Sequence, residues 1–268
     1  MALKNRTQEG ANVLGAIAGD IIGSVYEQRP IKTMEFPLFQ RSSRFTDDTV
    51  LTVAIASSIM EKVYYAASLR AFGRKYPNAG YGGAFFNWLL DPEAGPYNSW
   101  GNGAAMRVSP VGFAFSTIEE VLSEAKKTAE VSHNHPEGIK GAQATALAVF
   151  LARSGATKRQ IQNEITRRFG YDLSRTIDEI RPQYGFDISC QGTVPEAITA
   201  FLESKDYEDA VRKAISLGGD SDTLACITGG IAHAFYKKIS PEIVVEVRKL
   251  LPEEFSIIID KFSAAYPL

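Results

Sequence analysis

The segment from Val13 to Tyr26 constrains the fold most. Its apolar residues recur at nearly the period of an α-helix, and three glycines at every fourth position form what we call the glycine seam (Gly15, Gly19 and Gly23). A glycine costs a helix about 1 kcal/mol relative to alanine, so such a seam makes sense where a second helix approaches closely. We therefore expect a central helix here, in which Asp20 is anomalous on a buried face unless its carboxylate is bonded to a partner.

The rest of the chain also favours helices. No convincing run of alternating apolar residues predicts a strand, and residues 171–188 have the least clear pattern. Start and stop signals together with apolar periodicity predict further helices at 46–60, 66–76, 84–90, 116–131, 136–153, 157–169, 195–203, 207–216, 222–236, 241–250 and 254–265. An all-α fold follows.

Composition narrows the class of protein. The 268 residues are 45% hydrophobic with a net charge of -2, which predicts one globular domain over residues 1–268 and no basic field that would attract nucleic acid. No apolar stretch approaches the roughly 18 residues of a membrane-spanning helix, and residues 1–10 lack the apolar core of a signal peptide. We expect a cytoplasmic protein whose two cysteines, Cys190 and Cys226, are reduced and buried. A monomer is favoured, with the oligomeric state otherwise open.

Two acidic motifs carry the chemistry, and the first is the stretch 217–224. In the middle of a helix Asp220 and Asp222 would point to nearly opposite sides, so they converge only if Asp220 lies in a turn and Asp222 opens the helix. Gly218 and Gly219 permit that turn.

The second motif, Thr46-Asp47-Asp48-Thr49, repeats this chemistry at another predicted helix start. Helix capping is the simple alternative for both motifs, because Ser, Thr and Asp oxygens accept the free N–H groups of a first turn. Capping needs one oxygen per helix, whereas each motif supplies several before an apolar helix that should be buried. Such clustered carboxylates require cations, and hard oxygen ligands suit a pair of Mg²⁺, Mn²⁺ or Ca²⁺ ions.

Five segments, in this order, resemble the ADP-ribosylglycohydrolase family, which includes dinitrogenase reductase-activating glycohydrolase and the eukaryotic ADP-ribosylhydrolases. Two acidic motifs with a glycine loop between them are a specific signal, although either alone would be weak. The resemblance spans about Gly15 to Tyr236, and its segments are Gly15–Ser24, Phe45–Thr49, Gly101–Gly103 with Met106-Arg107, Ser132-His133 and Gly218–Thr223.

The resemblance implies a compact orthogonal helical bundle with a binuclear Mg²⁺ or Mn²⁺ site. The ions would bind the hydroxyls of the distal ribose and act as Lewis acids beside the scissile bond, with Asp47, Asp48 and Asp222 as catalytic residues. The implied metal ligands are Thr46, Asp47, Asp48, Asp220, Asp222 and Thr223.

Glu27 follows the first predicted helix, at the place where the family branch that cleaves O-linked ADP-ribose has a Glu. This match implies that Glu27 activates water or gates the metal site. The alternative is a solvated Glu at a helix end, although a helix C-terminus is a poor place for a negative charge without a partner. Arg107, in an apolar context, is expected to pair with a buried carboxylate and has no assigned catalytic role.

The loop 98–103, here called the glycine loop, offers backbone N–H groups that could cradle a diphosphate. The alternative for the loop is a tight turn that binds no ligand. The alternative for Trp100 is a position in the hydrophobic core. The match implies that Trp100 stacks on adenine, and that His133, at the start of the long helix, donates to a phosphate rather than merely capping. His135 and His233 are expected to be structural. The implied substrate-binding residues are Ser99, Trp100, Gly101, Asn102, Gly103 and His133.

Together these features predict an enzyme that uses two Mg²⁺ or Mn²⁺ ions to release ADP-ribose from a modified protein, nucleotide or small molecule. Glu27 favours O-linked substrates, such as ADP-ribosyl-serine or O-acetyl-ADP-ribose, with ADP-ribosyl-arginine as the alternative. Two rivals are a non-catalytic ADP-ribose-binding or crystallin-like structural protein, which would have lost metal ligands, and a metal phosphohydrolase, which would release phosphate.

Overall fold

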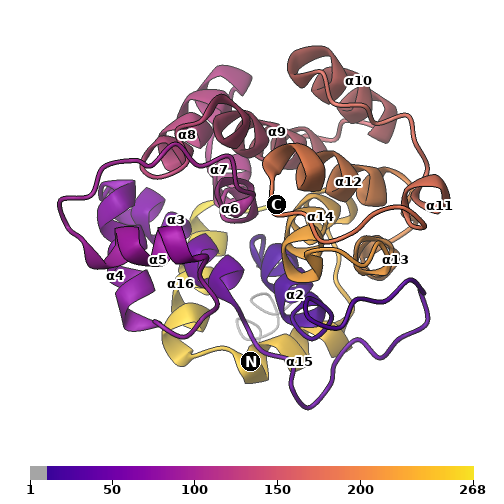
Figure 1. The fold of residues 1–268 in the computed structure, drawn as a ribbon, viewed down its shortest axis with the longest axis horizontal. Helices are drawn as coiled ribbons and strands as arrows, with labels where there is room; N and C mark the ends of the chain where they lie inside the picture. The colour runs from indigo at the N-terminus through magenta and orange to yellow at the C-terminus, as the bar shows by residue number, and fades with distance from the viewer. Residues whose placement is uncertain (1–10) are drawn as a thin grey trace.

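The structure, a computed structural model, describes residues 11–268; the polar segment 1–10 considered above lies outside them. The described chain is helical and contains no β-strand (Figure 1). One antiparallel bridge joins Gly101 to Ser189. The predicted all-α class is confirmed. The helices are α2 (Leu14–Gly23), α3 (Asp47–Glu61), α4 (Tyr65–Lys75), α5 (Gly83–Leu90), α6 (Gly103–Met106), α7 (Ser109–Ala114), α8 (Ile118–Glu130), α9 (Pro136–Arg153), α10 (Lys158–Phe169), α11 (Ile177–Ile180), α12 (Cys190–Leu202), α13 (Tyr207–Ser216), α14 (Ser221–Tyr236), α15 (Pro241–Leu250) and α16 (Glu253–Ala265).

The helices α2 and α14 lie side by side near the middle of the molecule and form its most extensive helix–helix contact (Figure 1). Every residue of α2 is buried. A β-carbon added at Gly19 would lie 2.0 Å from the carbonyl oxygen of Ala225, and one added at Gly23 would lie 2.4 Å from that of Ser221. The glycine seam therefore faces α14, and the prediction of a close helix approach is confirmed.

The buried apolar side chains form two clusters. One contains α2 and α12–α14 together with parts of α10, α15 and α16, and the other fills the space between α4, α5 and α8. Helices α3 and α9 contribute residues to both clusters. Helices α3 and α9 therefore connect the two apolar clusters. Helix α3 also contacts both α2 and α14. Both cysteines are free and buried, as predicted.

Local signals explain where most helices begin. Thr117 and Thr157 form capping boxes at α8 and α10, in which the hydroxyl and the third helical residue satisfy each other's backbone N–H groups. Helix α12 begins at Cys190, not at the predicted Pro195, because the hydroxyl of Ser189 accepts a hydrogen bond from Gly192 N at 3.1 Å and the helix continues through the proline. Helices α6, α7 and α11 were not predicted, being too short to show a period.

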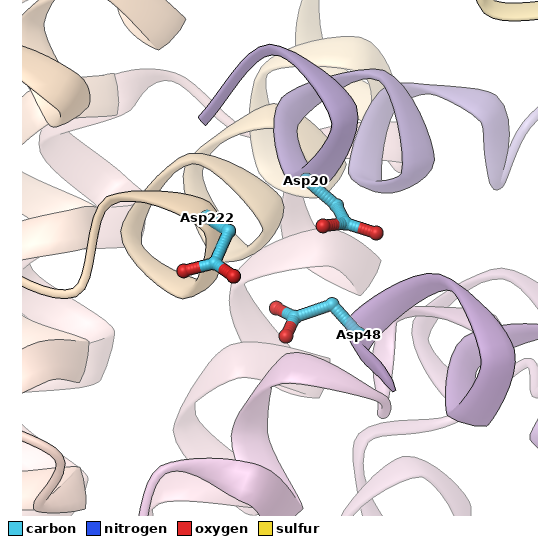
Figure 2. Close-up of side chains that lie close together, drawn as sticks. All are labelled: Asp20, Asp48 and Asp222. Carbon is cyan, nitrogen blue, oxygen red and sulfur yellow. The ribbon is translucent and has the colours of Figure 1, made fainter. Parts of the chain in front are cut away.

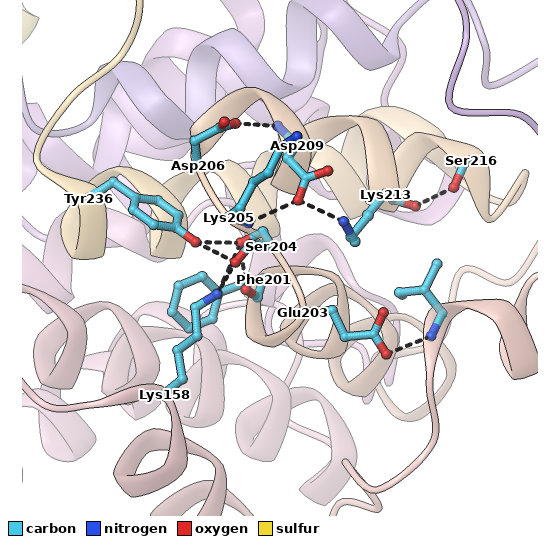
Figure 3. A network of polar contacts seen from close by, with 11 residues as sticks. Lys158, Phe201, Glu203, Ser204, Lys205, Asp206, Asp209, Lys213, Ser216 and Tyr236 are labelled. Carbon is cyan, nitrogen blue, oxygen red and sulfur yellow. Dashed lines mark hydrogen bonds and ion pairs between the residues drawn. The ribbon is translucent and has the colours of Figure 1, made fainter.

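Helix α10 is attached to the central helices by Lys158, its first residue. The ammonium group donates to the carbonyl oxygen of Ser204, between α12 and α13, and Tyr236 of α14 donates to the same oxygen at 2.7 Å (Figure 3). Burial lowers the pKa of Lys158 to about 8. Over residues 11–268, every helix is too short or too polar to cross a bilayer.

Candidate active site

Three carboxylates from three different helices meet beside the central pair. Asp20 of α2, Asp48 of α3 and Asp222 of α14 point toward one another, and each offers an oxygen within 4.8 Å of the others (Figure 2). All three are buried. We call this group the aspartate cluster.

A second group, the Glu27 cluster, consists of Glu27, Asp220 and Asp222, whose oxygens also lie within 4.8 Å of one another. Asp222 belongs to both clusters. The side chain of Asn102 donates to Asp220 at 2.8 Å, so the glycine loop supports this carboxylate. The arrangement offers two adjacent groups of oxygen donors that share one aspartate.

The turn before α14 makes this convergence possible. Gly218 has a φ of +66°, a left-handed conformation that glycine adopts without the strain of a side chain. Asp220 is the N-cap residue of α14, and Asp222 lies in its first turn. This placement of the two carboxylates is the one that the sequence requires for them to converge.

Asp20 is bonded to the start of α3, which resolves its anomalous place in an apolar helix. Its carboxylate accepts from Thr46 N at 3.0 Å, Thr46 Oγ1 at 2.7 Å and Thr49 N at 3.1 Å, and also from the hydroxyl of Thr49. Asp20 thus caps α3 from another helix. Asp20 is not among the metal ligands expected from the sequence, although a single carboxylate in a buried glycine-rich helix is a signal for one.

The clusters hold uncompensated negative charge. Within the described residues, Lys, Arg and His nitrogens lie farther than 4.0 Å from the carboxylates of Asp20, Asp48, Asp220 and Asp222. Asp48 Oδ1 is buried without a hydrogen-bond partner. Burial, reinforced by neighbouring carboxylates, raises the pKa of Asp48 and of Asp222 well above the usual range. Such a group needs a cation.

Two further predicted ligands, Thr223 and Asp47, differ in where they lie relative to the clusters. The hydroxyl of Thr223 donates to Asp48 Oδ2 at 3.4 Å, which places it at the aspartate cluster. Asp47 belongs to neither carboxylate cluster; its N–H donates to Ala79 O at 2.9 Å, and its side chain borders the cavity next to Gly80. Burial, followed by the charge of Asp20, raises the pKa of Asp47 to about 8.

A cavity of about 380 Å³ opens above both clusters and extends along the glycine loop. Ser99, Gly101, Asn102 and Gly103 all border it. Three backbone N–H groups of the loop are already engaged, however: that of Asn98 donates to Asn134 Oδ1, that of Gly101 to Ser99 Oγ and that of Asn102 to Ile188 O. These three N–H groups are therefore not free to bind a diphosphate.

Trp100 does not border this cavity. Its ring is 53% exposed and lies edge-on to His135, with the ring centroids 5.8 Å apart. Phe186 and Ile188 border the cavity instead and are 63% and 58% exposed. Neither residue is predicted from the sequence, because both lie in the segment with the least clear pattern, residues 171–188.

The position of His133 and the contacts of Arg107 differ from those predicted. The N-cap of α9 is His135, whose ring accepts from Glu137 N, while the N–H of His133 donates to Ala129 O at the end of α8. His133 is thus outside the first turn of α9. Arg107 is fully buried, but in the described chain its guanidinium pairs with no carboxylate, so that expectation is wrong.

Both the sequence and the fold of this chain are similar to those of known proteins. The family model for ADP-ribosylglycohydrolase matches residues 9–266. ADP-ribosylhydrolase ARH3 from Homo sapiens is 28% identical, with 83% of each chain covered, and ADP-ribosylarginine hydrolase Tri1 from Pseudomonas putida is 25% identical over 88% of this chain and 72% of its own. A solved structure described as an ADP-ribosylglycohydrolase-related protein complex has the same fold, with a TM-score of 0.73, 24% identity and 98% of each chain covered.

Proposed function

This chain belongs to the ADP-ribosylglycohydrolase family, and from that premise we propose that it is a Mg²⁺- or Mn²⁺-dependent enzyme that releases ADP-ribose from O-linked adducts. The family membership and the ARH3 relatives establish an ADP-ribosyl hydrolase. The metal and the O-linkage are the proposed parts. The observation that carries the proposal is that two carboxylate clusters share Asp222, with every aspartate buried and Glu27 half-buried.

The residues of the two clusters fit a pair of divalent ions. Their donors are oxygens, the aspartates are buried, and Asp48 Oδ1 has no hydrogen-bond partner, so a cation would satisfy an atom that the protein leaves unpaired. Two bound ions would supply Lewis acidity and a fixed positive charge beside the ribose hydroxyls. The proposed ligands are Asp20, Thr46, Asp47, Asp48, Asp220, Asp222 and Thr223.

Glu27 is placed to handle the proton of the attacking water. It lies four residues beyond the end of α2, partly buried at the border of the cavity. Burial, followed by the charge of Asp220, raises its pKa, which improves it as a proton acceptor. Water forms a bond to the anomeric carbon and transfers a proton to Glu27, the bond from that carbon to the acceptor oxygen breaks, and the released oxygen takes up a proton.

The rest of the cavity suits the remainder of ADP-ribose. The exposed ring of Phe186 offers a stacking surface for adenine, a role that the sequence analysis had assigned to Trp100. The glycine loop and His133 border the same cavity, and we assign the diphosphate to them. The substrate would be an ADP-ribosylated protein, nucleotide or small molecule.

The arginine-linked alternative rests on the relative from Pseudomonas putida, which is named for that activity. Glu27, at the place where the O-linkage-cleaving branch of the family has a Glu, favours O-linked substrates. A non-catalytic or crystallin-like protein would have lost carboxylates from the clusters, whereas all are present here.

The decisive experiment incubates the pure protein with ADP-ribosyl-serine peptide, O-acetyl-ADP-ribose and ADP-ribosyl-arginine, each with Mg²⁺, with Mn²⁺ and with chelator. We expect metal-dependent release of ADP-ribose, fastest from an O-linked substrate. Faster release from ADP-ribosyl-arginine would replace the O-linkage proposal with the alternative. Release that survives chelation would contradict the metal site.

A further inference from the structure

His133 belongs to a hydrogen-bonded chain of three side chains, together with Ser132 and Arg107. Its ring is buried between Phe85 and Tyr97, with ring centroids 6.2 and 5.7 Å away, and it borders the cavity. Its Nδ1 lies 2.8 Å from Ser132 Oγ, which in turn lies 2.9 Å from Arg107 Nη2. The three side chains form a line that leads from a buried cation to the cavity.

The direction of each hydrogen bond follows from what each group can donate. A guanidinium has no acceptor, so Arg107 must donate to Ser132 Oγ, and its other Nη2 hydrogen goes to Thr128 O at 2.8 Å. The single hydroxyl hydrogen of Ser132 then has one acceptor among the described residues, which is Nδ1 of His133. The reverse arrangement would leave a buried hydroxyl hydrogen unpaired, which is energetically unfavourable.

The other ring nitrogen faces the glycine loop. A β-carbon added at Gly103 would lie 3.0 Å from His133 Nε2, and one added at Gly101 would lie 3.6 Å from it. The glycines thus leave open the space into which this nitrogen points. With Nδ1 accepting from Ser132, the proton of a neutral imidazole must be on Nε2.

We infer that Arg107 and Ser132 are positioning residues, which fix His133 as a neutral Nε2–H donor aimed at an anionic oxygen of the substrate's diphosphate. This inference rests on the proposed function for the identity of the ligand, but the tautomer itself is a property of the free protein. Burial, and then the charge of Arg107, lowers the pKa of His133 well below its usual value, which is consistent with a neutral ring. An anion at this place would also bring a counter-charge near Arg107, which has no carboxylate partner in the described chain.

The first test is nitrogen NMR of the free protein with labelled histidine at neutral pH. The chain has three histidines, so His135→Asn and His233→Asn assign the two other signals. We expect His133 to be protonated at Nε2, with Nδ1 shifted by an accepted hydrogen bond that Ser132→Ala removes. A proton on Nδ1 in the wild type would overturn the inference. Because this readout needs no substrate, it stands apart from failure of the proposed hydrolysis, which would appear as no ADP-ribose release.

The second test measures ADP-ribose binding by calorimetry with variants that reproduce one nitrogen or the other. His133→Gln places an amide near Nε2 and should bind within about threefold of the wild type, whereas His133→Asn places it near Nδ1 and should bind about ten- to hundredfold more weakly. Equal affinity of these two variants would contradict the inference. Thermal melting of each variant separates lost binding from lost folding.

Ser132→Ala keeps the ring but frees its orientation and tautomer, so ADP-ribose should bind about three- to tenfold more weakly. The matched control is Ser109→Ala, which removes a buried hydroxyl that has no hydrogen-bond partner. The control should bind as the wild type does. If Ser132→Ala binds as tightly as Ser109→Ala, Ser132 has no positioning role.

Discussion

At the scale of single residues, the site depends on charges that the protein buries without compensating them. Asp222 serves two clusters at once, and Asp48 Oδ1 has no partner. A buried carboxylate of this kind is costly, and folding tolerates it where another component supplies the opposite charge. Glu27 differs from these aspartates because it is only partly buried, at the border of the cavity. We therefore assign it to the reaction rather than to holding the ions alone.

Glu27→Gln should lower turnover while leaving the affinity for ADP-ribose within about threefold of the wild type, because the amide keeps the size of the carboxylate but cannot take up a proton. Loss of a positioned proton acceptor typically costs about 10²–10⁴ in rate. Single-turnover kinetics and calorimetry on the same preparation measure the two quantities. An equal loss of both would indicate that Glu27 has a structural role.

His233 gives a pH dependence of stability that is separate from the active site. It is buried with Nδ1 3.0 Å from Asn12 O, and burial lowers its pKa to about 4 from the usual 6.5. Between pH 6.5 and 4 the unfolded chain therefore binds a proton that the folded protein does not. This contribution to stability is complete above pH 6.5 and is lost as the pH falls toward 4, by about 3 kcal/mol at most.

We expect His233→Asn, which retains a donor near Nδ1, to show a smaller loss of unfolding free energy than the wild type between pH 6.5 and 4. Urea unfolding at several pH values measures the difference, and His135→Asn is the control at a partly exposed histidine. Parallel pH profiles for the wild type and His233→Asn would show that His233 is not the group responsible.

At the scale of helices, the close contact of α2 with α14 decides where the carboxylates lie. The glycine seam lets the two backbones approach, and this approach places Asp20 within reach of Asp222. Asp20 also caps α3, so one side chain ties the position of a second helix to the first. Helix packing and site geometry are consequently one property in this protein.

Gly19→Ala should destabilise the protein by about 2 kcal/mol or more, because the added methyl group would lie 2.0 Å from Ala225 O and the helices must separate. Chemical unfolding measures the change. Gly95→Ala is the matched control, since a β-carbon there meets no atom within 4 Å, and it should change stability by less than about 0.5 kcal/mol. Similar stabilities for both variants would mean that the seam is looser than described.

At the scale of the whole molecule, the two clusters join segments from both ends of the chain. Helix α2 lies near the N-terminus, α14 near the C-terminus, and α3 bridges the two apolar clusters between them (Figure 1). Ions bound at the clusters would link these helices and relieve the repulsion between their carboxylates. Metal binding should therefore stabilise the entire fold.

Addition of Mg²⁺ or Mn²⁺ to chelator-treated protein should raise the free energy of unfolding by about 3 kcal/mol at a hundredfold excess over the dissociation constant. For a chain of this size, the melting temperature should rise by roughly 5–10 °C. Differential scanning calorimetry measures the shift. A melting temperature that does not respond to either ion would refute the metal site.

Asp222→Asn should abolish this shift, because it removes the carboxylate that both clusters share. In chelator the variant should melt no lower than the wild type, since it removes one of several buried carboxyl groups that disfavour each other's ionisation. The control is Asp178→Asn, whose carboxylate is 88% exposed and remote from the clusters, and which should respond to metal as the wild type does.

Local patterns in the sequence predict the fold class and most of the helices of this protein. Helical periodicity gave the class and most helices, the glycine seam gave the close pair, and the two acidic motifs indicated a metal site, because each of these features depends on neighbours along the chain. The resemblance of the motifs gave the family. The expected stacking role of Trp100 comes from its position in a motif, and the expected ion pair of Arg107 comes from its apolar context. In the structure Trp100 does not border the cavity, and Arg107 pairs with no carboxylate of the described chain.

Only the tertiary structure decided which distant residues share a site. Asp20 joins the aspartate cluster through packing of α2 against α3 and α14, Phe186 reaches the cavity from a segment without a period, and Arg107 meets Ser132 through the contact of α6 with α8. These contacts depend on how buried helices fit together rather than on spacing along one helix. A sequence pattern fixes which face of a helix is buried, but the neighbour that this face meets is chosen by the packing of the whole chain.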